Sequence, residues 1–312
     1  MSKPDPGKFV IAAALILALA LTLTACSKLK DAVADMQHSE AFLDSRIPAG
    51  LSPQYYPPSG FVWGEFRSGN LPEARYGVAA PPTNPKAHIL ILADADYPAE
   101  VYFELMQQYI QAGYGVWLLE APGQGGAGHY FLQDNQISTS DYHNAQTVAR
   151  DFIRDIIRPT TGQPLFILGT GYSALTGLYL GADPKAGNIR GIIAYNPYLG
   201  GPISAGDDWH SDTQQAGHWG GIAQIWQMSN PDLRRLKKSK DWRDQMKKAF
   251  SDVIPSSMSK NAAPILLLEP KRVTTEQANA ANALCARLPA CVLQLSGGEE
   301  TLGVETLNFL AQ

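Results

Sequence analysis

The sequence has little net charge, little cysteine and no internal repeat. Its 25 lysines and arginines nearly balance 29 aspartates and glutamates, which leaves a formal net charge of −4. A chain so close to neutral gives no reason to expect a nucleic acid partner. Without a repeat, its 312 residues, 45% of them hydrophobic, fit one large globular domain or two small ones.

Only one long hydrophobic run is present, and the first of the three cysteines follows it directly. The run "FVIAAALILALALTLTA" comes after Lys3 and Lys8 and has the charged and apolar regions of an export signal. Cys26 ends the stretch "LTAC", which resembles the bacterial lipobox, where the cysteine is lipidated and becomes the first mature residue. We therefore expect residues 1–25 to be a lipoprotein signal peptide. A transmembrane anchor and an ordinary cleaved signal are the alternatives.

Lipidation at Cys26 implies a protein of the bacterial cell envelope that is attached to a membrane through its N-terminus. Ser27 stands where an aspartate commonly signals inner-membrane retention, so we expect the outer membrane, facing the periplasm. In this oxidising compartment Cys285 and Cys291, six residues apart, are expected to form a structural disulfide. Two buried thiols are the alternative.

The rest of the chain alternates between strand-like and helical segments. Residues 26–60 form a polar tether and an extended lead-in, and a hairpin of two short strands follows at 61–80. Apolar strand-like runs and helical stretches then alternate to the C-terminus: 87–94, 101–113, 114–120, 142–157, 164–170, 174–181, 189–197, 263–269, 275–288 and 291–297. This alternation predicts an α/β fold for residues 61–312, with a mostly parallel twisted sheet flanked by helices.

The alternation is interrupted from about residue 199 to 262, which is too long for a plain loop. Trp242, Met246 and Phe250 form an apolar stripe there, opposite lysines and arginines. We expect a small helical cap, inserted over the ends of the sheet.

Four passages occur in a distinctive order and spacing. They are "VYFELMQQYIQAGYGVWLLEAPGQGGAG", "PLFILGTGYSA", "IIAYNPYLG" and "APILLLEPKRV…CARLPACVLQLSGGEETL". In this order they resemble the α/β-hydrolases of the monoacylglycerol lipase and lysophospholipase type, which share a serine aminopeptidase-type hydrolase domain. The resemblance implies an α/β-hydrolase fold from about Phe61 to the C-terminus and places the catalytic positions of the family in the chain.

Each of those catalytic positions departs from the family pattern. The elbow serine of the Gly-x-Ser-x-Gly motif falls on Gly171. The acid falls at or beside Lys271, and the histidine falls on Glu300. The oxyanion loop reads Ala93 and Asp94, which places a carboxylate where a developing oxyanion needs hydrogen-bond donors. We expect Lys271 and Glu300 to approach each other as an ion pair instead of a catalytic contact.

Histidine is also scarce, with six in the chain and none after His218. The family order is nucleophile, acid, histidine, so no histidine of this chain can take the usual third place. Ser173, two residues beyond Gly171, is the alternative nucleophile. In an unshifted elbow it lies in the first helical turn, and its hydroxyl points away from the site.

These departures favour a catalytically inactive pseudohydrolase that acts in binding or scaffolding. The alternative is an active lysophospholipase or esterase that uses Ser173 with Glu300 or a cap histidine as its base. A purely structural envelope protein is a third possibility. The sequence predicts neither a cofactor nor a particular protein partner.

The insertion offers further binding groups. A lipid or acyl ligand under the cap is a possible partner, and three tryptophans either line its entrance or pack the cap: Trp209, Trp219 and Trp226. The basic run 234–248 either contacts anionic lipid or forms a solvated helix face. The acidic and histidine residues at 207–218 are irregularly spaced, so we expect a polar loop and no metal site there.

Overall fold

The computed structural model describes residues 38–131, 136–212, 215, 217–256, 263–288 and 290–311. The expected signal peptide, the lipidation site at Cys26 and residues 27–37 of the tether lie outside this part of the chain. Among the residues described, no helix is long and apolar enough to cross a membrane.

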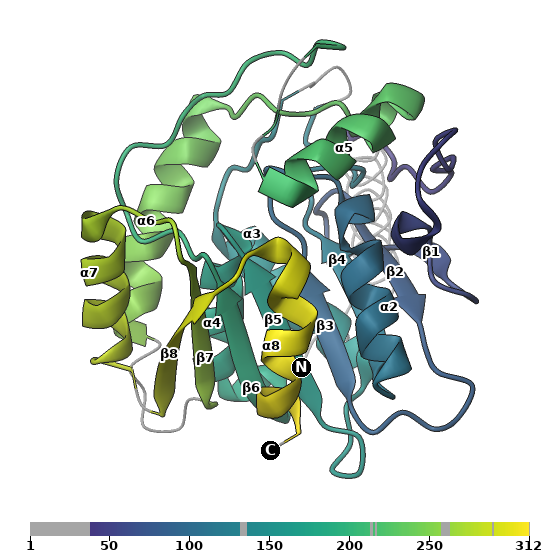
Figure 1. Ribbon diagram of the computed structural model, residues 1–312. Helices are drawn as coiled ribbons and strands as arrows, with labels where there is room; N and C mark the ends of the chain where they lie inside the picture. The colour runs from purple at the N-terminus through teal and green to yellow at the C-terminus, as the bar shows by residue number, and fades with distance from the viewer. Residues whose placement is uncertain are drawn as a thin grey trace, which may run out of the picture.

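An eight-stranded sheet forms the centre of the molecule, with strand order β1-β2-β4-β3-β5-β6-β7-β8 (Figure 1). Its strands are β1 (Val62–Phe66), β2 (Ala74–Ala79), β3 (His88–Leu92), β4 (Gly115–Glu120), β5 (Leu165–Thr170), β6 (Ile189–Tyr195), β7 (Ile265–Pro270) and β8 (Cys291–Ser296). β1 and β2 form the expected antiparallel hairpin, and β2 pairs antiparallel with β4. Every other pair of neighbours is parallel, which confirms the predicted mostly parallel sheet.

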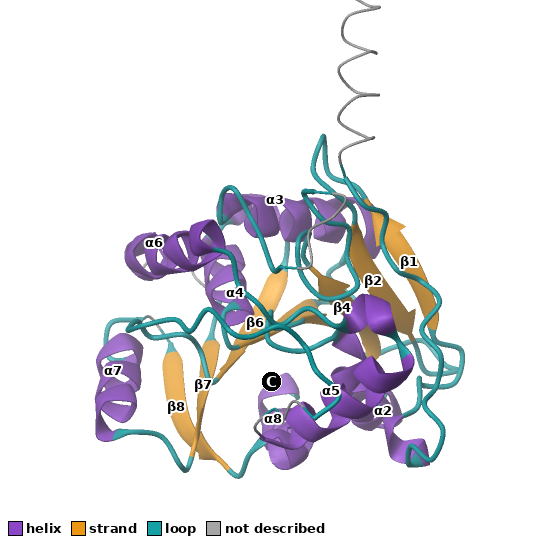
Figure 2. Cartoon of the chain, turned by 90° about the horizontal axis from the view of Figure 1, so that it is seen from above, coloured by secondary structure: helices purple, strands orange, loops and turns teal. Residues whose placement is uncertain are grey.

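Helices cover both faces of this sheet, as buried parallel strands require (Figure 2). They are α2 (Phe103–Gln111), α3 (His143–Phe152), α4 (Ser173–Ala182), α5 (Gly217–Ser229), α6 (Lys240–Ser256), α7 (Thr275–Cys285) and α8 (Leu302–Leu310). One apolar core lies between the sheet and α2, α5 and α8. A second core lies on the other face, against α3, α4, α6 and α7.

The two helices of the insertion lie on opposite sides of the sheet. Trp219 of α5 packs on Tyr195, the last residue of β6, with ring centroids 5.8 Å apart, so α5 covers the carboxyl ends of the strands. Helix α6 packs beside α4 instead (Figures 1 and 2). Met246 and Phe250 of its apolar stripe contact the second core. The insertion therefore forms part of the helical layer as well as a cap.

A disulfide joins the end of α7 to the start of β8. Cys285 and Cys291 are linked with an S–S distance of 2.01 Å and a Cα–Cα distance of 5.4 Å. The bond closes a short turn and leaves no thiol at either position, in agreement with the disulfide expected from the sequence.

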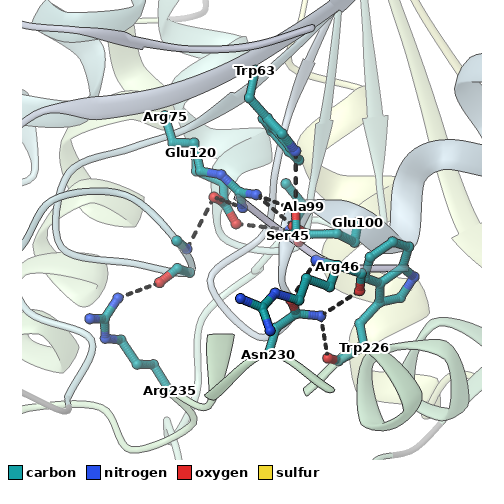
Figure 3. A network of polar contacts seen from close by, with 12 residues as sticks. Ser45, Arg46, Trp63, Arg75, Ala99, Glu100, Glu120, Trp226, Asn230 and Arg235 are labelled. Carbon is teal, nitrogen blue, oxygen red and sulfur yellow. Dashed lines mark hydrogen bonds and ion pairs between the residues drawn. The ribbon is translucent and has the colours of Figure 1, made fainter. Parts of the chain in front are cut away.

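Residues 38–60 lie against the domain. The amide of Arg46 donates to Oδ1 of Asn230 at 2.7 Å, and Nδ2 of Asn230 donates to the carbonyl of Arg46 at 3.0 Å. Ser45 accepts from the indole of Trp63 on β1 (Figure 3). The lead-in thus connects the hairpin to the loop that follows α5.

Candidate active site

The strand-to-helix elbow keeps the backbone geometry of a nucleophile position without the nucleophile. β5 ends at Thr170, and α4 begins at Ser173. Gly171, between them, has φ +54°, the left-handed conformation that glycine adopts most readily. Its amide donates to the carbonyl of Tyr195 at 3.0 Å, which holds the turn against the end of β6.

The carboxylate of Asp94 lies in front of this elbow. Its Oδ1 accepts the backbone N–H of Tyr172 at 3.1 Å and that of Ala95 at 2.8 Å. In the fold family the oxyanion hole is built from the N–H after the nucleophile and an N–H of the loop after β3. Tyr172 and Ala95 occupy these two places. Both donors of the hole are therefore occupied by the protein's own carboxylate.

Asp94 also fills the space that a nucleophile side chain would need. A Cβ atom added to Gly171 would overlap the carboxylate oxygens of Asp94. Asp94 is only 7% exposed. Burial and the nearby Asp96 raise its pKa well above the ordinary value, although the two backbone N–H donors oppose the shift. A side chain at position 171 would therefore require Asp94 to move.

The loop that carries Asp94 is held by hydrogen bonds and by the insertion. The amide of Asp94 donates to the hydroxyl of Tyr102 at 3.0 Å, and this hydroxyl lies 2.6 Å from Oγ1 of Thr170. Lys238, from the segment between α5 and α6, forms an ion pair with Asp96 and is 8% exposed. Asp94 is therefore enclosed and has little freedom to leave the oxyanion hole.

A buried ion network holds Ala99 and Glu100, which follow this loop in the chain (Figure 3). Arg75 of β2 lies between Glu100, at 2.6 Å, and Glu120, at 3.1 Å, and all three side chains are almost completely buried. Glu120 also accepts the amides of Ala99 at 2.8 Å and Gly126 at 3.1 Å. The network joins the loops that follow β3 and β4, so it fixes the position of the segment with Asp94.

Ser173, the alternative nucleophile, has its hydroxyl engaged by the backbone. Its Oγ donates toward the carbonyls of Leu92 at 2.6 Å and Thr170 at 2.8 Å, and accepts the amide of Thr170 at 3.1 Å. A hydroxyl in this position ties the start of α4 to the ends of β3 and β5. These contacts indicate a structural role, and among the described residues neither a histidine nor a carboxylate is hydrogen-bonded to Ser173.

The expected ion pair between Lys271 and Glu300 is wrong. Oε1 of Glu300 lies 3.1 Å from Nδ1 of His218, and Nε2 of the same ring lies 3.0 Å from Oε2 of Glu104. Within the described part of the chain, Lys271 forms no ion pair with Glu300. Lys271 follows the end of β7 and Glu300 follows the end of β8, as the sequence predicted, but the sequence did not reveal that Glu300 pairs with His218 of α5.

Glu269 is a carboxyl group that the sequence analysis passed over. It belongs to β7, two residues before Lys271, and is only 2% exposed. Its Oε1 has no hydrogen-bond partner among the described residues, and burial raises the pKa of Glu269 to about 7. An acidic residue at the end of the apolar run "ILLL" was the signal that could have identified it.

Replacing Glu269 by glutamine is expected to stabilise the protein at alkaline pH. Because its pKa is raised, Glu269 keeps a proton in the folded state at pH values where the unfolded chain has released it. The contribution of Glu269 to the free energy of unfolding is therefore fully present below about pH 4.5 and is lost as the pH rises through about 7. The glutamine variant lacks this loss, which amounts to about 3 kcal/mol above pH 8. Urea denaturation at acidic and alkaline pH measures the difference.

The exposed Glu276 is the matched control for that experiment. Glu276→Gln should change the free energy of unfolding little at any pH. An equal effect of Glu269→Gln at acidic and alkaline pH would show that Glu269 does not titrate in this range.

The remaining candidate groups form no second catalytic site in the described residues. Trp219 and Trp226 are buried and pack the cap, whereas Trp209 stacks with Arg234, whose guanidinium lies 4.1 Å from the ring centroid.

No described cluster of histidine, cysteine or acidic residues has the arrangement of a metal site. In the basic run, Arg235 donates to the carbonyl of Gly125 at 2.7 Å, so at least part of this run holds the fold together.

Comparison with solved structures supports the fold. A monoglyceride lipase from Saccharomyces cerevisiae, in complex with a substrate analogue, matches 87% of this chain and 97% of its own, with a TM-score of 0.60 and 13% identity. The monoacylglycerol lipase of Paleococcus ferrophilus matches 75% of this chain and 97% of its own, with a TM-score of 0.57 and 14% identity. By sequence, no family model and no curated protein matches. Together with the sheet order, these likenesses confirm the α/β-hydrolase fold.

Proposed function

We propose that this α/β-hydrolase-fold protein is a catalytically inactive, lipid-anchored protein of the bacterial cell envelope. It uses the hydrolase scaffold for binding, and the N-terminal lipid at Cys26 holds it on the outer membrane facing the periplasm. The occupied oxyanion hole is the observation that carries the proposal.

The site opposes ester hydrolysis at two separate steps. Gly171 provides no nucleophile, and Oδ1 of Asp94 already accepts the two backbone N–H groups that would stabilise an oxyanion. Nucleophile, base and orienting acid act as a unit, so loss of one member removes most of the benefit of the others. His218 cannot replace the missing base at the elbow, because it lies between Glu104 and Glu300.

A fluorophosphonate serine-hydrolase probe tests inactivity directly. We expect the purified full-length chain to remain unlabelled at a concentration that labels an active lipase completely. The Ser173→Ala variant is the control for the alternative nucleophile. Labelling of the unchanged protein that this variant abolishes would refute the proposal and support an ester hydrolase acting through Ser173.

The anchor is tested by mass analysis of the N-terminus after extraction from bacterial membranes. A mature chain that begins at a diacylated or triacylated Cys26 is expected, because the apolar run ends in a lipobox-like sequence. A Cys26→Ser variant serves as the control and should retain the signal peptide. An unmodified Cys26 in the mature chain would contradict the proposed attachment.

A further inference from the structure

The sheet ends at β8, which pairs with β7 on one side and with no described strand on the other (Figure 1). Such an edge presents unpaired backbone N–H and C=O groups, which can pair with another strand. Two apolar side chains of β8 are also exposed, Val292 by 50% and Leu295 by 64%. The strand contains no charged residue, no proline and no bulge, so it lacks the usual features that prevent pairing at an edge.

β1, at the other end of the sheet, has two of these protective features. Its Glu65 is exposed and places a charge on the strand. Its Trp63 donates to Oγ of Ser45 at 3.1 Å, so the lead-in lies beside it. Charged residues and covering segments are how edge strands avoid association. Of the two edges, β8 is therefore the one suited to pairing.

The hydrogen bonds between β7 and β8 fix which backbone groups of β8 point outward. The amide of Lys271 donates to the carbonyl of Ser296 at 3.2 Å, so Ser296 faces β7. In a parallel ladder, alternate residues direct both their N–H and their C=O to the same side. The backbone groups of Cys291, Leu293 and Leu295 therefore point to the open edge, and these three residues are placed symmetrically about Leu293.

This arrangement is complementary to itself. In an antiparallel pair, residues that exchange both hydrogen bonds lie directly opposite each other. A two-fold axis at Leu293 places Leu293 opposite its own copy and Cys291 opposite Leu295 of the second copy, so all three outward residues are paired. Their side chains lie on the face covered by α7, to which Cys291 is joined by the disulfide. The exposed Leu295 would be covered by the second copy.

The charges beside β8 fit the same arrangement. α7 and the turn after it carry two charged residues, Glu276 in the first turn and Arg287 before β8, and both are exposed. Because α7 connects two parallel strands, it runs opposite to β8, so Glu276 lies toward the end of β8 and Arg287 toward its start. The two-fold axis places Glu276 of one copy at the same end of the interface as Arg287 of the second copy. This complementarity favours antiparallel over parallel pairing.

The geometry points to a symmetric dimer in which β8 of two copies of this chain pair antiparallel about Leu293 and join the two sheets into one. The interface uses the β8 edge and the outer surface of α7. The dimer does not depend on the proposed loss of catalysis, because β8 and the elbow involve different residues.

Site-specific photocrosslinking of the full-length chain in bacterial membranes tests the dimer. p-Benzoylphenylalanine replaces Gln294, an exposed residue of β8, and the products are separated by mass. We expect a product with twice the mass of the chain, in which peptides of β8 are joined to β8. Leu295→Lys should lower its yield about tenfold, because a lysine at a strand edge opposes pairing. Val62→Lys, at a 60% exposed side chain of β1, is the matched control and should leave the yield unchanged.

Exchange of the two charges tests the orientation of the copies. Glu276→Arg and Arg287→Glu should each lower the yield about fivefold, because like charges then face each other, and the double variant should restore it. Circular dichroism should show that all these variants fold, since every changed side chain is exposed. Absence of a dimer-sized product, a product formed with a different protein, a dimer unaffected by Leu295→Lys, or a double variant as weak as the single ones would overturn the proposed pairing.

Discussion

Replacing Gly171 by serine is expected to destabilise the protein without producing esterase activity. The new side chain would overlap the carboxylate of Asp94, and a residue other than glycine is strained at φ +54°. Overpacking and backbone strain together predict a loss of about 2–4 kcal/mol in the free energy of unfolding. Activity should stay at background, because no imidazole is placed to accept the hydroxyl proton. Chemical denaturation and a chromogenic ester assay measure the two effects.

Gly162→Ser is the matched control for this substitution. Gly162 lies in a turn where an added Cβ would meet nothing within 4 Å, so its replacement should leave stability nearly unchanged. A Gly171→Ser protein as stable as the Gly162→Ser protein would show that Asp94 does not occupy the space in front of the elbow.

A double-mutant cycle between Gly171 and Asp94 tests whether the overlap with Asp94 causes the loss of stability in Gly171→Ser. Asp94→Ala alone leaves the amides of Tyr172 and Ala95 without their acceptor and should lower stability by about 1–3 kcal/mol. In the Gly171→Ser background, the same change also removes the overlap, so the combined loss should be smaller than the sum of the single losses. Asp94→Asn keeps the size of the side chain and should not relieve Gly171→Ser.

Replacing Arg75 by methionine is expected to cause a still larger loss of stability, about 3–5 kcal/mol. Burial opposes the charge of Arg75, but Glu100 and Glu120 outweigh it, so the pKa of Arg75 lies above its ordinary value. Without the guanidinium, two buried carboxylates face each other unpaired. Stacking of Arg75 on Trp63, 3.5 Å from the ring centroid, is lost as well. Urea denaturation measures the change.

The effect of Arg75→Met should depend on pH. Burial already raises the pKa of Glu120, and Arg75 opposes that shift, so the folded-state pKa rises further in the variant. Its stability therefore falls as the pH rises, and the deficit against the unchanged protein is smaller in acid. Glu100→Gln should recover part of the loss. Arg154→Met, at a side chain that is 59% exposed, is the control and should change stability little, because solvent screens its ion pairs.

Much of the fold could be predicted because the relevant information is local in the sequence. Continuous apolar runs predicted the parallel strands β3 to β8, and the short hairpin before them was found from its alternating residues and turn. The place of Gly171 at the elbow was also found from the sequence, because the apolar run of β5 ends directly before it. The helix–strand boundary at Cys285 and Cys291 likewise favoured the disulfide.

The partners of side chains from distant segments were harder to predict. Lys271 and Glu300 lie at the loops where the resemblance placed them, yet Glu300 contacts His218 because α5 of the insertion packs above the carboxyl ends of the strands. The apolar stripe of the insertion indicates which face of α6 is buried, but not which surface of the domain it packs against. For the same reason, the sequence did not show that α6 joins the helical layer beside α4.

The amino-acid sequence by itself determined the alternation of strands and helices and the absence of a serine at position 171. It also determined that no histidine follows His218. Only the tertiary structure decided that Oδ1 of Asp94 accepts both donors of the oxyanion hole, at 3.1 and 2.8 Å. The physical reason is the distance in sequence between the residues that interact. Strands and turns form through neighbouring residues, whereas the position of the Asp94 carboxylate depends on how three loops, an ion network and a cap pack together.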